Sequence, residues 1–278
     1  MRLSVLDGRA TLITADGEVD VERASDGFFD ADVTTLYPRW AEFRAWAAPR
    51  TDASADLQPE AARIGAISPT PSQVFAIGLN YVDHATESGF AVPTVPIVFT
   101  KFPSSISAPF GELVLTGNEV DWEIEVVAVI GAGGRNIAAS RAWDAVAGLT
   151  VGQDFSDRTL QFAGAPSQFS LGKSFAGFAP VGPTLVTPDA LPRPEEMVLE
   201  CTVDGERMQR APLSDLIFSI PFIIEFLSGV VELRPGDVVF TGTPPGVGFG
   251  MTPPRYLTSG QVVRSSVSGL GWMEQVCR

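Results

Sequence analysis

Short apolar runs separated by glycine- and proline-containing segments dominate the chain, and they predict strands. At the N-terminus the runs RLSVLDG and ATLITADG meet at Asp7-Gly8, and an Asp-Gly pair between alternating residues is typical of a β-hairpin. From residue 72 onward predicted strands alternate with predicted loops. Strands are predicted at 74–79, 97–102, 123–130, 148–154, 199–204, 237–241 and 261–267.

Helical periodicity is restricted to a few segments, in which apolar residues recur every three or four positions. These segments are 35–49, 140–149 and 213–229. The last one is the most apolar, and we expect it to start with Ser214 as N-cap, to bend at Pro221 and to stop at Gly229.

A polar, proline-containing stretch at 50–70 separates the first hairpin and helix from the rest of the chain. We therefore predict a small N-terminal α+β domain at 1–70 and a larger domain at 71–278. Strands outnumber helices, and strand and helix do not alternate regularly, which favours the α+β class over a doubly wound parallel sheet.

Composition narrows the possible functions. The 278 residues are 45% hydrophobic and 19% charged, as in a globular protein, and the formal net charge is −14. Nucleic acids and anionic membrane surfaces are repelled by such a charge, so we expect neither as a partner. The longest apolar run, 216–231, is too short to span a bilayer and the N-terminus lacks a signal-peptide core, so we expect a cytoplasmic protein.

Two glycine-containing stretches approach nucleotide-binding motifs without matching them. SLGKS at 170–174 resembles the end of a phosphate-binding loop, but Ser167 stands where that motif requires glycine. GAGGRN at 131–136 begins like a dinucleotide fingerprint and then places Asn136 at the third small position. The sequence also lacks the G-x-S-x-G elbow that serine hydrolases need.

Three carboxylates stand at the ends of predicted strands. In VDWEIEVVAVIG, Glu123 and Glu125 share one strand face, which continues with the apolar Val127 and Val129. Like charges on a face that becomes core need a cation between them, unless the start of the strand is simply solvated. Asp154 ends the next predicted strand. Three carboxylates without Cys or His suit Mg²⁺, Mn²⁺ or Ca²⁺.

His84 is the only histidine in the chain, and Glu87 follows three residues later. If residues 80–88 form a helical turn, the two side chains are neighbours. A carboxylate beside an imidazole fixes its tautomer and raises its basicity, which is how a general base is prepared. The alternative is an ordinary exposed pair on a helix.

Together these segments resemble the fumarylacetoacetate hydrolase family. The matching segments occur in family order over residues 72–275, namely IGLNYVDHATE, VDWEIEVVAVIG, AGLTVGQDFSDRTLQ, GKSFAGFAPVGP and RPGDVVFTGTPPGVG. The resemblance implies a mixed β-sandwich or roll, and the first seventy residues resemble the small extra domain of many bacterial members.

The resemblance also implies roles for individual residues. The metal, Mg²⁺ or Mn²⁺, would be held by Glu123, Glu125 and Asp154. The catalytic groups would be His84, Glu87 and Lys173. The substrate-binding groups would be Arg158, Gln161 and Thr243. The alternative for Lys173 is a surface lysine, and the alternative for Arg158 is a surface pair with an acid such as Asp157.

The implied activity is metal-dependent hydrolysis of a carbon–carbon bond in a small β-diketo acid, such as an acylpyruvate or a fumarylacetoacetate-like compound. Oxaloacetate decarboxylation and hydroxydienoate isomerisation could use the same site, and a keto-acid-binding protein without turnover is a further alternative. The resemblance also leads us to expect a homodimer.

Overall fold

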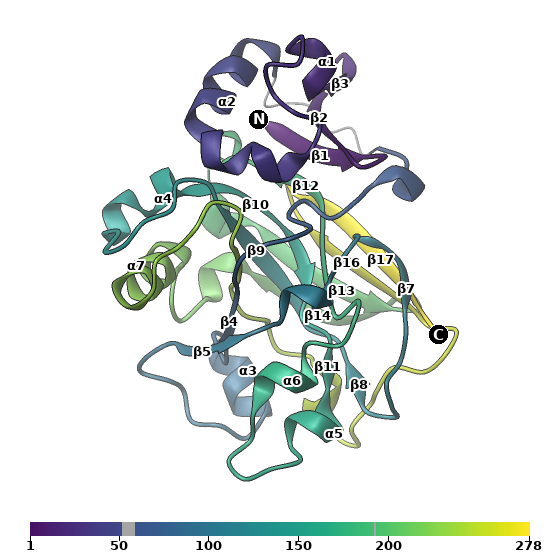
Figure 1. The fold of residues 1–278 in the computed structure, drawn as a ribbon. Coiled ribbons are helices and arrows are strands. Elements are labelled where there is room, and N and C mark those ends of the chain that lie inside the picture. The colour runs from purple at the N-terminus through teal and green to yellow at the C-terminus, as the bar shows by residue number, and fades with distance from the viewer. Residues whose placement is uncertain (52–58, 192) are drawn as a thin grey trace.

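The computed structural model describes residues 1–51, 59–191 and 193–278. Within these ranges the largest sheet has ten strands, nine of them in the order β3-β2-β1-β12-β10-β9-β15-β4-β5, with β6 paired to β12 (Figure 1). The strands are β1 Arg2–Leu6, β2 Arg9–Thr14, β3 Gly17–Asp20, β4 Val74–Gly78, β5 Ile97–Thr100, β6 Ile106–Ser107, β9 Ile124–Ile130, β10 Val146–Gln153, β12 Ala179–Val186 and β15 Val238–Phe240.

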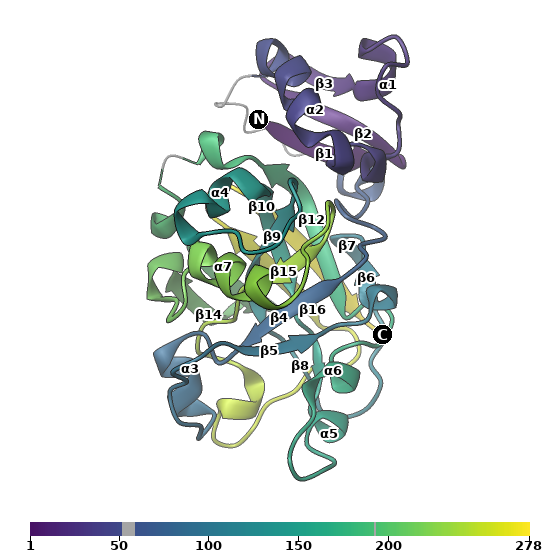
Figure 2. The same ribbon diagram turned by 60° about the vertical axis from the view of Figure 1, so that its left-hand side comes forward.

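A second sheet of five strands packs against one face of the first sheet, in the order β14-β13-β16-β17-β7 (Figure 2). Its strands, and those of a separate two-stranded ladder, are β7 Phe110–Leu113, β13 Val198–Val203, β14 Glu206–Pro212, β16 Val262–Val267, β17 Gly271–Cys277, β8 Val120–Asp121 and β11 Ser156–Asp157. Parallel and antiparallel pairs both occur. This mixed β-sandwich confirms the expected α+β class.

Strand β9 shows how the sequence pattern builds both sides of the large sheet. Ile124 and Val126 belong to the core between the two sheets. Val127 and Val129 belong to the core on the opposite face, where Trp40 and other N-terminal side chains cover them. Because successive side chains of a strand point to opposite faces, an almost continuous apolar run is what a strand buried on both sides requires.

The N-terminal residues are joined to the large sheet by backbone pairing. Strand β1 runs antiparallel to β12, with Arg2 opposite Val186 and Ser4 opposite Thr184. The sheet thus continues across the predicted division between residues 1–70 and 71–278, and that division stays a prediction.

The helices are short, and most of them lie at the edges of the sheets (Figure 1). They are α1 Val21–Ala24, α2 Trp40–Ala47, α3 Val82–Glu87, α4 Ala142–Ala145, α5 Arg158–Gln161, α6 Phe169–Gly172 and α7 Ile220–Val230. No helix in the described ranges has both the length and the apolar character needed to traverse a bilayer.

The predicted helix at 140–149 is wrong in its second half. Helix α4 ends at Ala145, and β10 begins at Val146. All eight residues of β10 are buried between β9 and β12. At Gly148 an added Cβ would lie 2.7 Å from Leu185 Cγ, so only glycine permits this close approach. Burial in a central ladder therefore outweighs the local helical pattern.

The predicted helix at 213–229 starts later than expected. Ser219, not Ser214, precedes α7, and Pro221 lies in the first turn instead of bending the helix. Proline costs no hydrogen bond there, because the first N–H groups of a helix have no intrahelical partner. Gly229 lies inside α7, which ends at Val230.

The predicted set omits eight strands that the described residues form, namely β3, β6, β7, β8, β11, β12, β14 and β17. Strand β12 contains Pro180, Gly182 and Pro183, and prolines argue against a central strand because they cannot donate to a ladder. In the structure the register between β10 and β12 shifts between Leu149 and Val151, opposite Pro183. The irregularity accommodates the missing N–H group, and the strand continues on both sides of it.

We predict opposite effects of alanine at two glycines. In β10, Gly152→Ala would place a Cβ 2.4 Å from Val127 Cγ2 and 2.8 Å from Phe240 Cε1, so overpacking should lower the free energy of unfolding by about 1–3 kcal/mol. In α7, Gly229 has nothing within 4 Å, so Gly229→Ala should leave stability unchanged or raise it by about 0.5–1 kcal/mol. Urea unfolding measures both, and equal midpoints for the two variants would contradict this account of β10.

Candidate active site

Pairing of β9 with β10 brings the three predicted metal ligands together. The strands are antiparallel, with Glu125 opposite Gly152, and the N–H of Asp154 donates to the Glu123 carbonyl at 2.9 Å. One carboxylate oxygen from each of Glu123, Glu125 and Asp154 lies within 4.8 Å of the others. All three side chains are buried, so their mutual repulsion is poorly screened by solvent.

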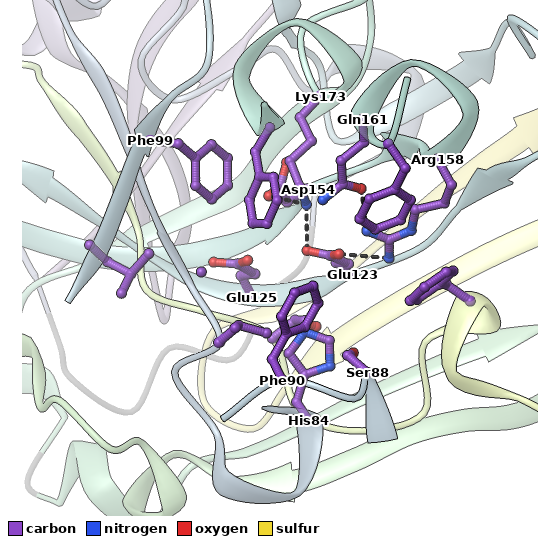
Figure 3. Close-up of a pocket in the computed structure, with 17 residues that line it drawn as sticks. His84, Ser88, Phe90, Phe99, Glu123, Glu125, Asp154, Arg158, Gln161 and Lys173 are labelled. Atoms are coloured by element: carbon purple, nitrogen blue, oxygen red, sulfur yellow. Dashed lines mark hydrogen bonds and ion pairs between the residues drawn. The ribbon is translucent and has the colours of Figure 1, made fainter. Parts of the chain in front are cut away.

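Two cationic side chains neutralise part of this cluster. Lys173 Nζ donates to Glu123 Oε2 at 2.7 Å and to Asp154 Oδ2 at 2.8 Å, and Arg158 Nη2 lies 2.7 Å from Glu123 Oε1 (Figure 3). Burial alone would raise the pKa of Glu123, but Lys173 and Arg158 outweigh burial and lower it to about 2. For Lys173 burial lowers the pKa, and the carboxylates of Asp154 and Glu123 more than reverse this effect.

Glu125 is the carboxylate that these cations leave uncompensated. Its Oε2 accepts the Gly242 N–H at 2.6 Å, and it has no ion pair with any residue that the structure describes. Burial, followed by the charges of Asp154 and Glu123, raises its pKa well above the ordinary value. A buried all-oxygen cluster with one uncompensated carboxyl can hold a divalent cation, and its hard donors fit Mg²⁺, Mn²⁺ or Ca²⁺.

His84 and Glu87 lie on α3, and His84 lines the wall of the cavity that faces the carboxylates (Figure 3). The helix ends where Gly89 takes a positive φ of 74°, and the spacing of three brings the two side chains together. His84 Nδ1 lies 2.9 Å from Glu87 Oε1, and the Gly246 N–H donates to both oxygens of Glu87 at 3.0 and 2.9 Å. A carboxylate on Nδ1 selects the tautomer in which Nε2 is free to accept a proton.

Lys173 is not a surface lysine, and Arg158 does not form a surface pair with Asp157, so both alternative interpretations are wrong. Lys173 is 2% exposed and Arg158 is 4% exposed. Arg158 pairs with Asp121 Oδ2 at 2.9 Å through Nε and at 2.7 Å through Nη2. Asp157 instead accepts the Leu160 N–H at the start of α5.

The predicted substrate-binding residues line the same cavity, but much of their hydrogen-bonding capacity is used within the protein. Gln161 Oε1 accepts from Arg158 Nη1 at 2.8 Å. The Thr243 hydroxyl donates to the Ile124 carbonyl at 2.9 Å and accepts from Gln209 Nε2 at 2.8 Å. Thr243 therefore reaches a ligand only through its remaining surface, whereas Gln161 keeps its amide donors.

Lys101 is a site residue that the sequence reasoning missed. It lies just after β5 and is 1% exposed, and its Nζ lies 2.5 Å from Asp154 Oδ1 and also donates to the Lys173 carbonyl. Burial lowers the pKa of Lys101, an effect that Asp154 opposes. Two features of the sequence could have identified it. The chain has only two lysines. Lys101 also follows Ile97 and Phe99 at a spacing of two, which places all three on one face of the predicted strand.

Two buried glutamines fix the backbone that carries the carboxylates. Gln153 Oε1 accepts the Glu123 N–H at 2.8 Å, and Gln209 Oε1 accepts the Ile124 N–H at 3.0 Å. Gln153 Nε2 also donates to Ser265 on β16, and Gln209 comes from β14. The five-stranded sheet therefore helps to position the carboxylates, although no local sequence pattern indicates either contact.

Comparison with known proteins identifies the family. The sequence model described as fumarylacetoacetate (FAA) hydrolase C-terminal matches residues 73–278, so the chain belongs to this family. A mitochondrial oxaloacetate tautomerase of Homo sapiens is 43% identical over 203 residues, which cover 72% of this chain and 65% of the human protein. The chain thus spans just under two thirds of that relative.

Solved structures share the whole architecture. A Mycobacterium smegmatis structure, described provisionally as an HpcE protein, is 50% identical with a TM-score of 0.92, and the match covers 100% of this chain and 99% of that one. A fumarylacetoacetate hydrolase from Exiguobacterium antarcticum is 30% identical with a TM-score of 0.86, over 100% and 99%. Members are thus named as hydrolases and tautomerases, and a further structural neighbour carries the name of an isomerase.

We predict that binding of Mg²⁺ or Mn²⁺ releases a proton. Because burial and the charges of Asp154 and Glu123 raise the pKa of Glu125, its carboxyl keeps a proton to higher pH than an ordinary carboxyl does, and that proton must leave before it can act as a ligand. Acid therefore opposes binding, and the apparent affinity should fall by up to about tenfold for each pH unit below that pKa. Calorimetry in buffers of different ionisation enthalpy measures the released proton. Glu125→Gln should abolish the release, and an affinity independent of pH would contradict the prediction.

We predict that Lys101→Met is strongly destabilising, because it leaves the buried Asp154 carboxylate without one of its cations. Breaking such a pair should lower the free energy of unfolding by about 3–5 kcal/mol. The matched control is Arg141→Ala, whose partner Asp144 is exposed and whose loss should cost less than about 1 kcal/mol. Urea unfolding compares the variants, and similar losses in both would show that Lys101 does not stabilise the site.

Proposed function

We propose that the protein is a divalent-metal-dependent hydrolase that cleaves a carbon–carbon bond in a small β-diketo acid such as an acylpyruvate. The observation that carries this proposal is the pair His84–Glu87, placed across the cavity from the three buried carboxylates. A site that only bound a keto acid would need no imidazole held in this tautomer. Membership of the fumarylacetoacetate hydrolase family supports the same class of reaction.

Glu123, Glu125 and Asp154 would hold Mg²⁺ or Mn²⁺. When bound, the ion supplies a Lewis acid for the adjacent oxygens of a keto acid. The cation would also stabilise the ionised form of Glu125, which burial and the neighbouring carboxylates disfavour in its absence.

His84, oriented by Glu87, then carries out the proton transfers. Glu87 holds Nδ1 of His84, so Nε2 takes a proton from water as the water oxygen adds to the acyl carbonyl carbon. The bond from that carbon to the central CH₂ carbon breaks, and its electron pair passes to the departing pyruvate fragment. His84 returns its proton to that CH₂ carbon, which gives a carboxylic acid and pyruvate.

Lys173 and Gln161 stabilise the charge that develops during this step. The Lys173 ammonium lies between Glu123 and Asp154, at the side of the cavity where the departing fragment would become an enolate. Gln161 accepts from Arg158 through Oε1, which leaves its amide N–H groups for the substrate. Both groups are buried, so their hydrogen bonds to an oxyanion would be little weakened by water.

The same base also suits a reaction without an attacking water. A relative 43% identical over 203 residues is named as an oxaloacetate tautomerase, a reaction in which a proton moves between carbon and oxygen. His84 Nε2 could remove a proton from the CH₂ group of a keto acid and return it to the oxygen. Tautomerisation is therefore the second candidate, and its products differ from those of hydrolysis.

A test of the proposal replaces the base and its partner. With an acylpyruvate and Mg²⁺ or Mn²⁺, His84→Ala and Glu87→Gln should lower kcat by about 10²–10⁴-fold, because general-base catalysis is lost. Metal affinity measured by calorimetry should change little, since neither residue belongs to the carboxylate cluster. Asp83→Asn is the matched control, because Asp83 lies on the same helix and outside the cavity lining, and it should keep full activity.

The outcomes separate the alternatives. Formation of pyruvate that depends on metal and on His84 supports hydrolysis. Interconversion of keto and enol forms without pyruvate would favour the tautomerase. If His84→Ala hydrolyses the acylpyruvate as fast as the unchanged protein, the assignment of the base is wrong.

A further inference from the structure

The walls of the active-site cavity carry a set of phenylalanine rings from five separate segments. Phe99 in β5 and Phe169 in α6 meet edge to face, with centroids 5.6 Å apart. Phe162, after α5, and Phe249 form a second pair in the lining, with centroids 4.8 Å apart. Phe90, after α3, stands beside His84 (Figure 3). None of the five is fully buried in the core, so each keeps ring surface for the cavity.

The rings surround the polar end of the site. Lys173 Nζ lies 5.3 Å from the centroid of Phe99, and the Arg158 guanidinium lies 5.8 Å from the centroid of Phe249. A substrate whose keto-acid end meets the carboxylate cluster and Lys173 would therefore extend its other end along aromatic surface. Apolar surface removed from water there favours binding, and aromatic walls are well suited to alkyl and aryl groups.

Among the described residues, the cavity lining offers no free, permanently charged cation for a second carboxylate. Among the described residues that line it, the permanently charged cations are Arg158 and Lys173. Each Arg158 nitrogen already has a partner in Asp121, Glu123 or Gln161. A carboxylate at the far end of a substrate would thus lose its water without gaining an ion pair, which is strongly unfavourable.

From these two observations we infer the substrate class. The site takes β-diketo acids with a single carboxylate and an alkyl or aryl group at the acyl end, and it discriminates against homologues with a second carboxylate at that end. This inference rests on the proposed function and makes it more specific. It also separates this chain from the relative named for oxaloacetate, which is a dicarboxylic acid.

A matched pair of substrates tests the inference, because the two differ only at the far end. In 2,4-dioxoheptanedioate a carboxylate replaces the terminal methyl group of 2,4-dioxoheptanoate. With Mg²⁺ or Mn²⁺, kcat/KM should be at least about tenfold higher for the monocarboxylate, because the second carboxylate is desolvated without a partner. Going from 2,4-dioxopentanoate to 2,4-dioxoheptanoate should raise kcat/KM by about fourfold per methylene group.

A kcat/KM for 2,4-dioxoheptanedioate equal to or above that for 2,4-dioxoheptanoate would overturn the inference and leave the proposed hydrolysis standing. If none of the three acids is turned over, the proposed function fails. The affinities of the same acids for the protein with Mg²⁺, measured by calorimetry, then decide the substrate class. The inference expects 2,4-dioxoheptanoate to bind more tightly than 2,4-dioxoheptanedioate.

Variants of the aromatic wall give an independent test. Phe90→Arg and Phe169→Arg each place a guanidinium at the cavity, so each should lower the preference for 2,4-dioxoheptanoate by about tenfold, since the second carboxylate gains an ion pair. Phe222→Arg is the matched control, because Phe222 lies on α7 away from the cavity and is 41% exposed, as Phe90 is. Circular dichroism verifies folding. An unchanged preference in both cavity variants would show that these rings do not select the substrate.

Discussion

The repulsion among three buried carboxylates is the constraint around which the site is organised. Pairing of β9 with β10 places Glu123, Glu125 and Asp154 within reach of one another in a region with little solvent. Such a cluster is tolerated only if positive charge lies close to it. The chain supplies this charge from Lys101, Lys173 and Arg158, and Glu125 has no ion pair among the described residues.

The surrounding structure holds this arrangement from several directions. Gln153, which bonds to the five-stranded sheet, and Gln209, which belongs to that sheet, fix the backbone at Glu123 and Ile124. The sandwich itself therefore determines where the carboxylates point. The His84–Glu87 pair depends on the loop after β15, because the N–H of Gly246 anchors Glu87. The His84–Glu87 pair and the acidic cluster are thus held by hydrogen bonds from different parts of the fold, which is what a preorganised site requires.

The sequence reveals those parts of the site that depend on local spacing. Glu123 and Glu125 could be paired because a strand has a period of two, and His84 with Glu87 because a helical turn has a spacing of three. Lys101 could not be connected to Asp154, because 53 residues separate them and only tertiary packing, in which β5 lies beside α6, brings them together. The start of β10 was assigned to a helix, because burial between two strands, and not local propensity, determines its conformation.

Both lysines of this chain contact the carboxylate cluster, at 1% and 2% exposure, and every other basic side chain except His84 is an arginine. The positive charge of the surface therefore comes from guanidinium groups, which keep their charge in alkaline solution where ammonium groups would lose it. Apart from the α-amino group, an amine-acylating reagent finds a target only when one of these two buried lysines becomes accessible to solvent. The rate of lysine acylation thus reports how often the region around the carboxylate cluster opens.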